Sequence, residues 1–373
     1  MRGPLQRDGG DQESPPGPAL TVGRDGARAP ATDMAIQFTA PSTFGRAFTS
    51  DTIELLRARL EPGEVAAGVP LSTLGRWRIG GPADVVVTPR SVEALGRALA
   101  TVAELGMPHV VIGDGSNLLF DDEGFRGVVI RVGRALGGFR AGPDGAVDAG
   151  AGLWVPSFVR QVIEAGLTGA THAIGIPGTL GGLVTMNGGS QRRGIGENVV
   201  HVDVVDHGGA LHRLDYAALG YSYRSSRLQR GDLIVVSARF RFEPGDRRAL
   251  RREAIGILAA RRAKFPRIRA NCGSVFVSDP KLYDLIGPPG AAIERVGLKG
   301  EAIGGAQISP EHANFIVNNG GARACDVLAL IALARRRVAE LSGVEMDAEV
   351  RHLAPDGTMR PAHEVIPDQE FSQ

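Results

Sequence analysis

Apolar residues recur along this chain at two spacings, and each spacing predicts a different kind of element. Spacings of three and four residues predict helices that begin near Asp51, at Ser91 as N-cap, at Trp154 and at Asp326, and an arginine-rich helix that ends near Lys264. Short apolar runs bounded by glycine or polar residues predict strands. They occupy residues 85–87, 110–112, 128–132, 146–149, 199–205, 210–214, 233–242 and 346–351. Strand–helix–strand units are mixed with hairpins, so the pattern predicts an α+β fold with a second sheet.

The two ends of the chain lack this periodicity. Residues 1–45 are rich in glycine, proline, alanine, arginine and aspartate, and we predict that they form a disordered leader. The leader contains no apolar core of a secretory signal. Met34 lies late in this tract and is a candidate for the true first residue. Residues 355–373 are expected to form a polar C-terminal tail.

Composition narrows the class of protein without identifying it. The 373 residues are 43% hydrophobic and 22% charged, which is ordinary for a globular protein, and the net charge is +1. Such a balance gives no reason to expect a nucleic-acid or membrane partner. The chain has 2 cysteines and 8 histidines, with no disulfide framework and no metal-ligand spacing. We expect a cytoplasmic protein with reduced thiols, no metal and no obligatory protein partner.

Two glycine-rich stretches carry the candidate chemistry. Gly113–Leu119 follows the apolar run 110–112, and Gly175–Asn187 has glycine at four of its first eight positions. Glycine lets the backbone approach a ligand closely, and successive N–H groups in such turns form a concave site for a diphosphate. The plainer interpretation is a tight loop between two strands. Neither stretch has the Rossmann glycine spacing or the lysine of a P-loop.

Eight short motifs in order make the chain resemble a known enzyme family. They are residues 78–84 (Arg-Ile-Gly-Gly-Pro-Ala-Asp), 113–119, 175–187, 223–226 (Tyr-Arg-Ser-Ser), 273–276 (Gly-Ser-Val-Phe), 297–300, 312–318 and 349–351 (Glu-Val-Arg). The chain is similar in these motifs to UDP-N-acetylenolpyruvoylglucosamine reductases of bacterial peptidoglycan synthesis, also called UDP-N-acetylmuramate dehydrogenases. The similarity runs from about Thr73 to Arg351 and fits the subtype that lacks an extra tyrosine-bearing loop.

The resemblance implies a fold and a cofactor. Two subdomains of the vanillyl-alcohol-oxidase (PCMH) type would bind FAD non-covalently, and a C-terminal α+β domain would cover the flavin and hold the substrate. On this chain we expect the subdomains at residues 46–125 and 126–245 and the substrate-binding domain at 246–354. The expected cofactor-binding residues are Gly80, Gly113, Gly115, Ser116, Asn117, Gly175, Ile176, Pro177, Gly178, Thr179, Gly181 and Asn187.

The resemblance also implies a reaction. NADPH would reduce the flavin, which passes hydride to the enolpyruvyl ether of UDP-N-acetylglucosamine enolpyruvate, and a neighbouring carbon would take a proton. Ser274 matches the family's proton donor, Arg224 would bind the substrate carboxylate, and Glu349 would orient or polarise the enolate end. Tyr223 would line the same pocket. Taken alone, Ser274 is a turn residue, Arg224 a surface arginine and Glu349 a solvent-facing residue.

The chain departs from the family pattern in the substrate-binding part. Val277 and Ser278 replace a lysine and an asparagine, and residues 188–197 replace a shorter alanine–glycine segment. We expect Arg192 and Arg193 in that segment to supply the missing positive charge to the substrate phosphates. Two other functions stay open: a related FAD reductase for a different nucleotide-sugar enol ether, and a non-catalytic flavin- or nucleotide-binding module. Cys272 is expected to be a bystander thiol.

Overall fold

A computed structural model describes residues 48–366 of the chain. The predicted leader and the candidate start at Met34 lie outside these residues, as does the end of the predicted tail from residue 367. Within the described part, no helix is long and apolar enough to cross a membrane.

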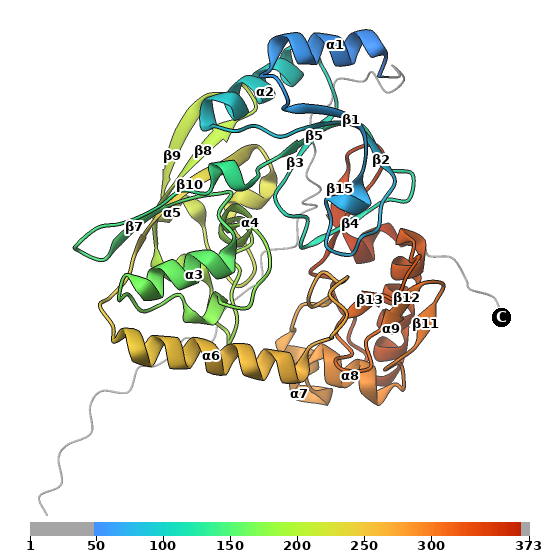
Figure 1. Cartoon of the computed structure of the whole chain (residues 1–373). Helices are drawn as coiled ribbons and strands as arrows, with labels where there is room; N and C mark the ends of the chain where they lie inside the picture. The colour runs from blue at the N-terminus through green and yellow to red at the C-terminus, as the bar shows by residue number, and fades with distance from the viewer. Residues whose placement is uncertain (1–47, 367–373) are drawn as a thin grey trace, which may run out of the picture. The chain divides into compact units, whose positions relative to one another are not determined.

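The first sheet has four strands, in the spatial order β1-β2-β5-β3 (Figure 1). The strands are β1 (Val65–Pro70), β2 (Pro82–Val87), β3 (His109–Ile112) and β5 (Phe125–Arg131), accompanied by α1 (Ser50–Arg59) and α2 (Val92–Glu104). The predicted cap of α2 is confirmed, because the Ser91 hydroxyl accepts a hydrogen bond from the Ala94 N–H at 3.1 Å. The predicted subdomain boundary at residue 125 is wrong: β5 pairs with β2 on one side and β3 on the other, so the first sheet extends to Arg131.

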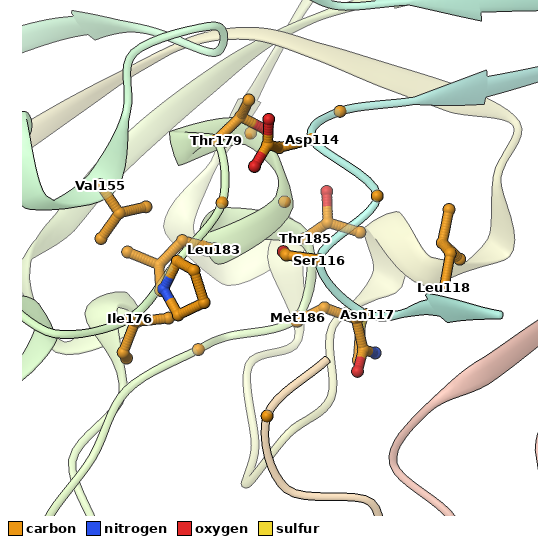
Figure 2. A pocket seen from close by; sticks show the side chains of 18 of the residues that line it. Asp114, Ser116, Asn117, Leu118, Val155, Ile176, Thr179, Leu183, Thr185 and Met186 are labelled. Carbon is orange, nitrogen blue, oxygen red and sulfur yellow. The ribbon is translucent and has the colours of Figure 1, made fainter. Parts of the chain in front are cut away.

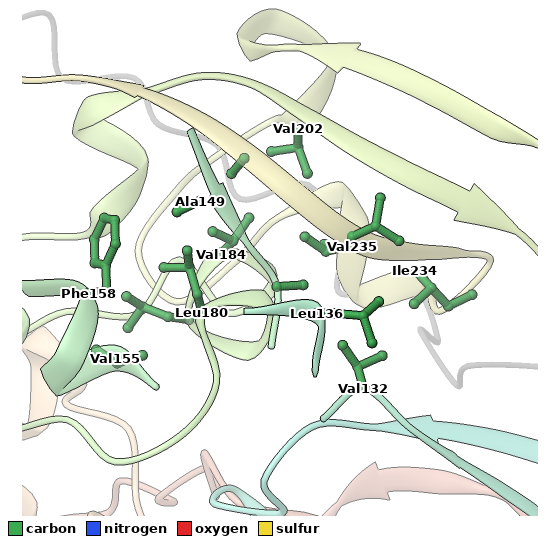
Figure 3. Packing of buried hydrophobic residues seen from close by; sticks show 14 of the residues in the cluster. Val132, Leu136, Ala149, Val155, Phe158, Leu180, Val184, Val202, Ile234 and Val235 are labelled. Carbon is green, nitrogen blue, oxygen red and sulfur yellow. The ribbon is translucent and has the colours of Figure 1, made fainter. Parts of the chain in front are cut away.

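The second sheet has five antiparallel strands, in the order β6-β7-β10-β8-β9. They are β6 (Phe139–Ala141), β7 (Ala146–Gly150), β8 (Val199–Asp206), β9 (Leu211–Asp215) and β10 (Leu233–Arg241), so the predicted hairpin and the long strand are confirmed. Helices α3 (Val155–Glu164) and α4 (Leu180–Thr185) pack on this sheet, and the short α5 (Tyr216–Leu219) follows β9. Figure 3 shows Phe158 and Leu180 directed at the apolar face of the strands, where burial of such side chains stabilises the fold.

Helix α6 (Arg247–Lys264) belongs with this second sheet rather than with the C-terminal domain. Its Leu250 and Ala254 join the same buried cluster as Phe158, and Figure 1 shows α6 alongside α3, with which it is in contact. The predicted domain start at residue 246 is therefore wrong, and the C-terminal domain begins after Lys264. A local helix pattern reveals an apolar face but not which neighbour covers it.

The C-terminal part forms a second buried cluster around α9, which Trp77, Ile79 and Leu119 from earlier in the chain join. Its elements are α7 (Pro280–Ile286), α8 (Pro289–Arg295), β11 (Ala302–Ile303), β12 (Ala306–Ile308), β13 (Ile316–Asn318) and α9 (Ala324–Ser342). Helix α9 begins two residues before the predicted cap at Asp326. The carboxylate of Asp122, far back in the chain, accepts a hydrogen bond from the Ala324 N–H at 2.7 Å and so caps the helix from outside the local sequence.

A small three-stranded sheet links residues 118–120 to the C-terminal end of the described chain. Strand β4 (Leu118–Phe120) pairs in parallel with β14 (Arg351–Leu353), which pairs with β15 (Met359–Pro361). Residues 346–350, predicted as the last strand, make only an isolated bridge between Ala348 and Phe276. The prediction of a polar tail from residue 355 is wrong up to residue 366, because Met359 and Ala362 are buried.

This sheet gives a test of the C-terminal correction. We expect Met359→Ala to lower the free energy of unfolding by about 2–5 kcal/mol, because it truncates a buried side chain. The adjacent control Arg360→Ala is exposed and is expected to stay within about 0.5 kcal/mol of the parent. Urea unfolding of both variants measures the difference, and equal, near-zero effects would mean that this segment contributes nothing to the fold.

Candidate active site

A cavity of about 470 Å³ brings together both glycine stretches and the three predicted catalytic residues. Arg224, Ser274 and Glu349 all line it, although they come from three separate parts of the chain. Nine predicted cofactor residues line it too: Gly113, Gly115, Ser116, Asn117, Ile176, Pro177, Gly178, Thr179 and Gly181. The order of the motifs therefore identified residues that converge in space.

The two glycine stretches touch each other at the cavity (Figure 2). A Cβ on Gly178 would lie 2.6 Å from the Ser116 hydroxyl, and one on Gly113 would lie 2.3 Å from the Thr179 hydroxyl. Gly178 also has φ of +126°, which side-chain-bearing residues rarely adopt. Each loop thus needs glycine where it meets the other, and their backbones reach the cavity wall without intervening side chains.

Arg224 is held in a strained turn. Ser222 and Ser225 exchange two backbone hydrogen bonds at 3.1 Å, and Arg224 between them has φ of +55°. Glycine would adopt this conformation without strain, so an arginine here costs free energy and indicates a role for its side chain. The guanidinium donates to the Gly189 carbonyl at 2.8 Å, and its Nε lies 3.0 Å from Oε1 of Glu349.

Glu349 is the second member of this ion pair. Its backbone N–H donates to the Val275 carbonyl at 2.8 Å, and its own carbonyl accepts a hydrogen bond from the Asn117 amide at 3.0 Å. Burial raises the pKa of the Glu349 carboxyl above its usual value, and the nearby Arg224 opposes the shift. The backbone of Glu349 is therefore fixed in position, and burial favours the protonated form of its carboxyl while Arg224 favours the charged form.

Ser274 lies on the segment that neighbours Glu349. Asn314 fixes this segment, because its carbonyl accepts from the Val275 N–H at 2.9 Å and its side chain exchanges two hydrogen bonds with the Phe276 backbone. Within residues 48–366 the Ser274 hydroxyl has no hydrogen-bond partner. The backbone is thus rigid while the hydroxyl remains available to a ligand.

Three predicted cofactor residues lie elsewhere. Gly80 packs against Phe120, whose Cβ would be 2.5 Å from an added Cβ, and a Cβ added to Gly175 would collide with the Arg261 side chain. Asn187 uses its side chain within the protein, donating to the Ser222 carbonyl and accepting from the Gly196 N–H. These residues shape the loops, and none of the three lines the large cavity.

The predicted substrate-binding residues line a second, smaller cavity of about 250 Å³. It is bordered by Tyr223, Arg192 and Arg193, and it adjoins the first at Arg224, which lines both. Arg193 is paired with Glu197 at 3.0 Å. Arg192 lies over the Tyr283 ring at 5.6 Å and has no ion pair within the described residues.

Two arginines at the large cavity were missed by sequence reasoning. Arg261 comes from α6 and Arg351 from β14. Arg351 had a signal, because it ends the Glu-Val-Arg motif, whereas Arg261 is one of several arginines in an arginine-rich helix. Cys272 also lines the cavity, but burial raises the pKa of its thiol to about 12, which fits the predicted bystander.

Two stretches of the chain match known protein families. Residues 83–215 match the FAD binding domain family, and residues 265–353 match the C-terminal domain of UDP-N-acetylenolpyruvoylglucosamine reductase. The second match begins at the residue after α6, in agreement with the corrected domain boundary. Together with the mixed sheets and helices, the matches confirm the predicted α+β fold with an FAD-binding part and a C-terminal domain.

Whole-chain relatives agree with these matches. UDP-N-acetylenolpyruvoylglucosamine reductase 1 of Corynebacterium glutamicum is 46% identical over 304 residues, covering 82% of this chain and 90% of that protein. The corresponding protein of Heliobacterium modesticaldum is 44% identical over 289 residues, covering 77% of this chain and 90% of that protein. The crystal structure of UDP-N-acetylenolpyruvylglucosamine reductase from Thermus caldophilus, 34% identical, superposes with a TM-score of 0.64 over 76% of this chain and 97% of that one.

The contact between the glycine loops gives a test of the cofactor site. We expect Gly178→Ala to weaken FAD binding at least tenfold, because the added methyl would collide with Ser116. Gly320→Ala is the matched control, since Gly320 has a similar φ of +120° but no atom within 4 Å of an added Cβ. FAD bound per polypeptide, measured during dialysis, compares the two variants. Equal loss from both would mean that backbone strain alone, not the loop contact, controls binding.

Proposed function

Because the chain belongs to the UDP-N-acetylenolpyruvoylglucosamine reductase family, we propose that its large cavity reduces the enolpyruvyl ether of UDP-N-acetylglucosamine enolpyruvate to UDP-N-acetylmuramate, with NADPH as reductant. The observation that carries the proposal is the convergence of Ser274, Arg224 and Glu349 on one cavity with the two glycine loops. A non-catalytic module would have no need for an arginine in a strained turn beside a buried carboxylate. Nothing in the geometry favours a different enol ether.

The residues around the cavity fit FAD. Loops 113–117 and 176–179 present backbone at positions where side chains are excluded, as binding of a diphosphate requires. Arg261 and Arg351 line the same cavity without an ion pair in the described residues, which suits a cofactor with two phosphate charges. When bound, the flavin supplies the hydride chemistry, and NADPH restores its electrons.

Arg224 is assigned to the substrate carboxylate. Its planar guanidinium can bind a carboxylate with two parallel hydrogen bonds, and the Gly189 carbonyl and Glu349 fix its orientation before substrate arrives. After hydride addition, negative charge accumulates next to that carboxylate. A preorganised cation at this point stabilises the charge as it develops.

Ser274 is assigned to the proton. Addition of hydride to the terminal carbon leaves a carbanion at the neighbouring carbon, which takes a proton from the Ser274 hydroxyl. A serine hydroxyl is a weak acid, so a nearby group must stabilise the oxygen and return its proton. The Glu349 N–H donates to the carbonyl of Val275, the residue after Ser274. We assign this role to the Glu349 carboxyl, because burial raises its pKa and so favours the form that carries a proton.

The smaller cavity is assigned to the substrate phosphates. Arg192 and Arg193 line the same cavity as Arg224, and Val277 and Ser278 stand where the family pattern has a lysine and an asparagine. Arg192 carries most of this proposal, because Arg193 already has a carboxylate partner in Glu197. We also place the reaction in the cytoplasm, where NADPH is available to it.

The overall proposal is tested by mixing the purified holoprotein with NADPH and UDP-N-acetylglucosamine enolpyruvate. NADPH oxidation should require the nucleotide sugar and stop when that substrate is consumed. Reduction of the flavin by NADPH without reoxidation by the nucleotide sugar would point to a different substrate.

Ser274→Ala should separate the two half-reactions. Reduction of the flavin by NADPH should stay within about twofold of the parent, because the hydroxyl is not assigned to that step. Reoxidation by the enolpyruvyl substrate should slow about 10²–10⁴-fold, as expected when a positioned acid is lost. Stopped-flow flavin absorbance measures both rates. If both slow equally, Ser274 acts in binding or folding instead.

Arg192→Ala should raise the KM for the nucleotide sugar about tenfold, which corresponds to loss of one charge-assisted hydrogen bond. Arg193→Ala should have a smaller effect, because Glu197 already shares its charge. NADPH-driven flavin reduction should be unchanged in both variants. A normal KM in Arg192→Ala would remove this residue from the substrate site.

A further inference from the structure

The charged residues that line the large cavity do not balance one another. They are Asp114, Arg224, Arg261, Glu349 and Arg351. Arg224 is paired with Glu349 at 3.0 Å, and Asp114 lies 3.7 Å from Arg131 behind the wall. Arg261 and Arg351 have no ion pair among residues 48–366. Among the described residues, the protein therefore holds two cations without ion pairs at this cavity.

Of the two arginines, Arg351 is the one with a buried donor that lacks an acceptor. One Nη donates to the Met359 carbonyl at 2.9 Å, whereas its Nε is buried without a hydrogen-bond partner in the described chain. Burial lowers the pKa of its guanidinium, and the carboxylate of Glu364, more than 4 Å away, opposes the shift. A buried cation with an unsatisfied N–H is costly unless a ligand completes it.

Arg351 is connected to Glu349, one of the residues assigned to the reaction, by its place in the chain and by hydrogen bonds. It follows Glu349 by two residues, and its backbone N–H donates to the Asn117 carbonyl at 3.1 Å. The Asn117 side chain in turn holds the Glu349 carbonyl, so one residue of the first glycine loop fixes both. Since Ser274 and Glu349 are assigned to the substrate carbons that receive proton and hydride, the flavin ring must lie within reach of this group.

Reduction changes the charge of a flavin. NADPH delivers a hydride, two electrons and one proton, and becomes NADP⁺; the flavin that accepts it gains one negative charge, which resides on the N1–C2 carbonyl edge of the ring. A fixed positive charge at that edge stabilises the reduced form more than the oxidised form and so raises the reduction potential.

We propose that Arg351 lies against the flavin ring and supplies this fixed positive charge. It thereby sets the reduction potential of the bound FAD. The inference rests on the proposed function, since it assumes FAD in the large cavity. Arg261 is assigned differently: it comes from α6, lies next to Gly175 of the second glycine loop and stacks on Phe265 at 4.6 Å. It is expected to affect how tightly FAD is held rather than its potential.

The test compares Arg351→Gln with Arg351→Lys and Arg261→Gln, all as FAD-loaded proteins. The two-electron midpoint potential is measured by equilibration with a reference dye, and sulfite affinity gives a second readout, because the sulfite adduct carries the same negative charge. Arg351→Gln should stabilise the reduced form at least tenfold less, which is about 30 mV for a two-electron couple. Its sulfite Kd should rise by a similar factor. Arg351→Lys, which keeps the charge, should recover most of both values.

Arg261→Gln should release FAD more readily. Its equilibrium constant for flavin reduction, measured against the same reference dye, should stay within about threefold of the parent. A yellow Arg351→Gln protein with the parent potential would overturn the inference alone. So would an equal shift in Arg261→Gln, because any cavity cation would then suffice. If Arg351→Gln does not fold, a tenfold loss in folded Arg351→Lys also overturns it. A protein that binds no FAD would overturn the proposed function as well.

Discussion

The ion pair between Arg224 and Glu349 is the interaction on which the candidate site depends. It links a tight turn beside the second sheet to the segment that leads into β14, and both side chains are about one-fifth exposed. Loss of one partner would leave the other charge largely desolvated, a cost of about 3 kcal/mol at the lower end of the buried range.

The pair between Arg224 and Glu349 also has a chemical consequence. A substrate carboxylate at Arg224 would compete with Glu349 for the same cation, and a carboxyl whose pKa is already raised by burial would then bind its proton more tightly. On the proposed assignment of Arg224, substrate binding would thus favour protonation of Glu349.

The glycine loops impose a second constraint, on backbone rather than charge. Gly113 and Gly178 allow two loops from different sheets to meet with no side chain between them. Glycine loses more conformational entropy on folding than other residues do, so the loops depend on the packing behind them for their stability. That packing comes from α4 and from the Asn117 amide, which fastens the first loop to the Glu349 backbone. The residues that would surround the cofactor and those that would act on substrate therefore share hydrogen bonds, and neither group can move independently.

Local patterns predicted most elements but few of the long-range pairings. The helix that begins after Ser91 and the strand 233–242 have clear periods, and both were found. By contrast, β14 has three residues and exists because β4, more than 200 residues earlier, offers it a parallel edge. No local period encodes such a pairing, so the strand was predicted a few residues too early. The start of α9 was predicted two residues too late for the same reason, since Asp122 in a distant loop accepts the hydrogen bond of the Ala324 N–H. The grouping of Arg224, Ser274 and Glu349 at one cavity was predictable only because motif order, unlike periodicity, carries information about residues that are distant in sequence.

The same reasoning explains why Arg261 and Arg351 were missed. Arginine is common in this chain, and only burial without a carboxylate partner distinguishes these two from the surface ion pairs of α6. An unpaired buried cation opposes folding of the empty protein, whereas an anionic ligand that satisfies it binds more tightly by a comparable amount. Cofactor binding and folding are consequently linked: FAD at 100 times its Kd would stabilise the native state by about 2.7 kcal/mol. Part of the stability of the fold would thus come from bound FAD, through the unpaired arginines of the cavity. Arg351, at the start of β14, is one of these arginines and lies two residues after Glu349.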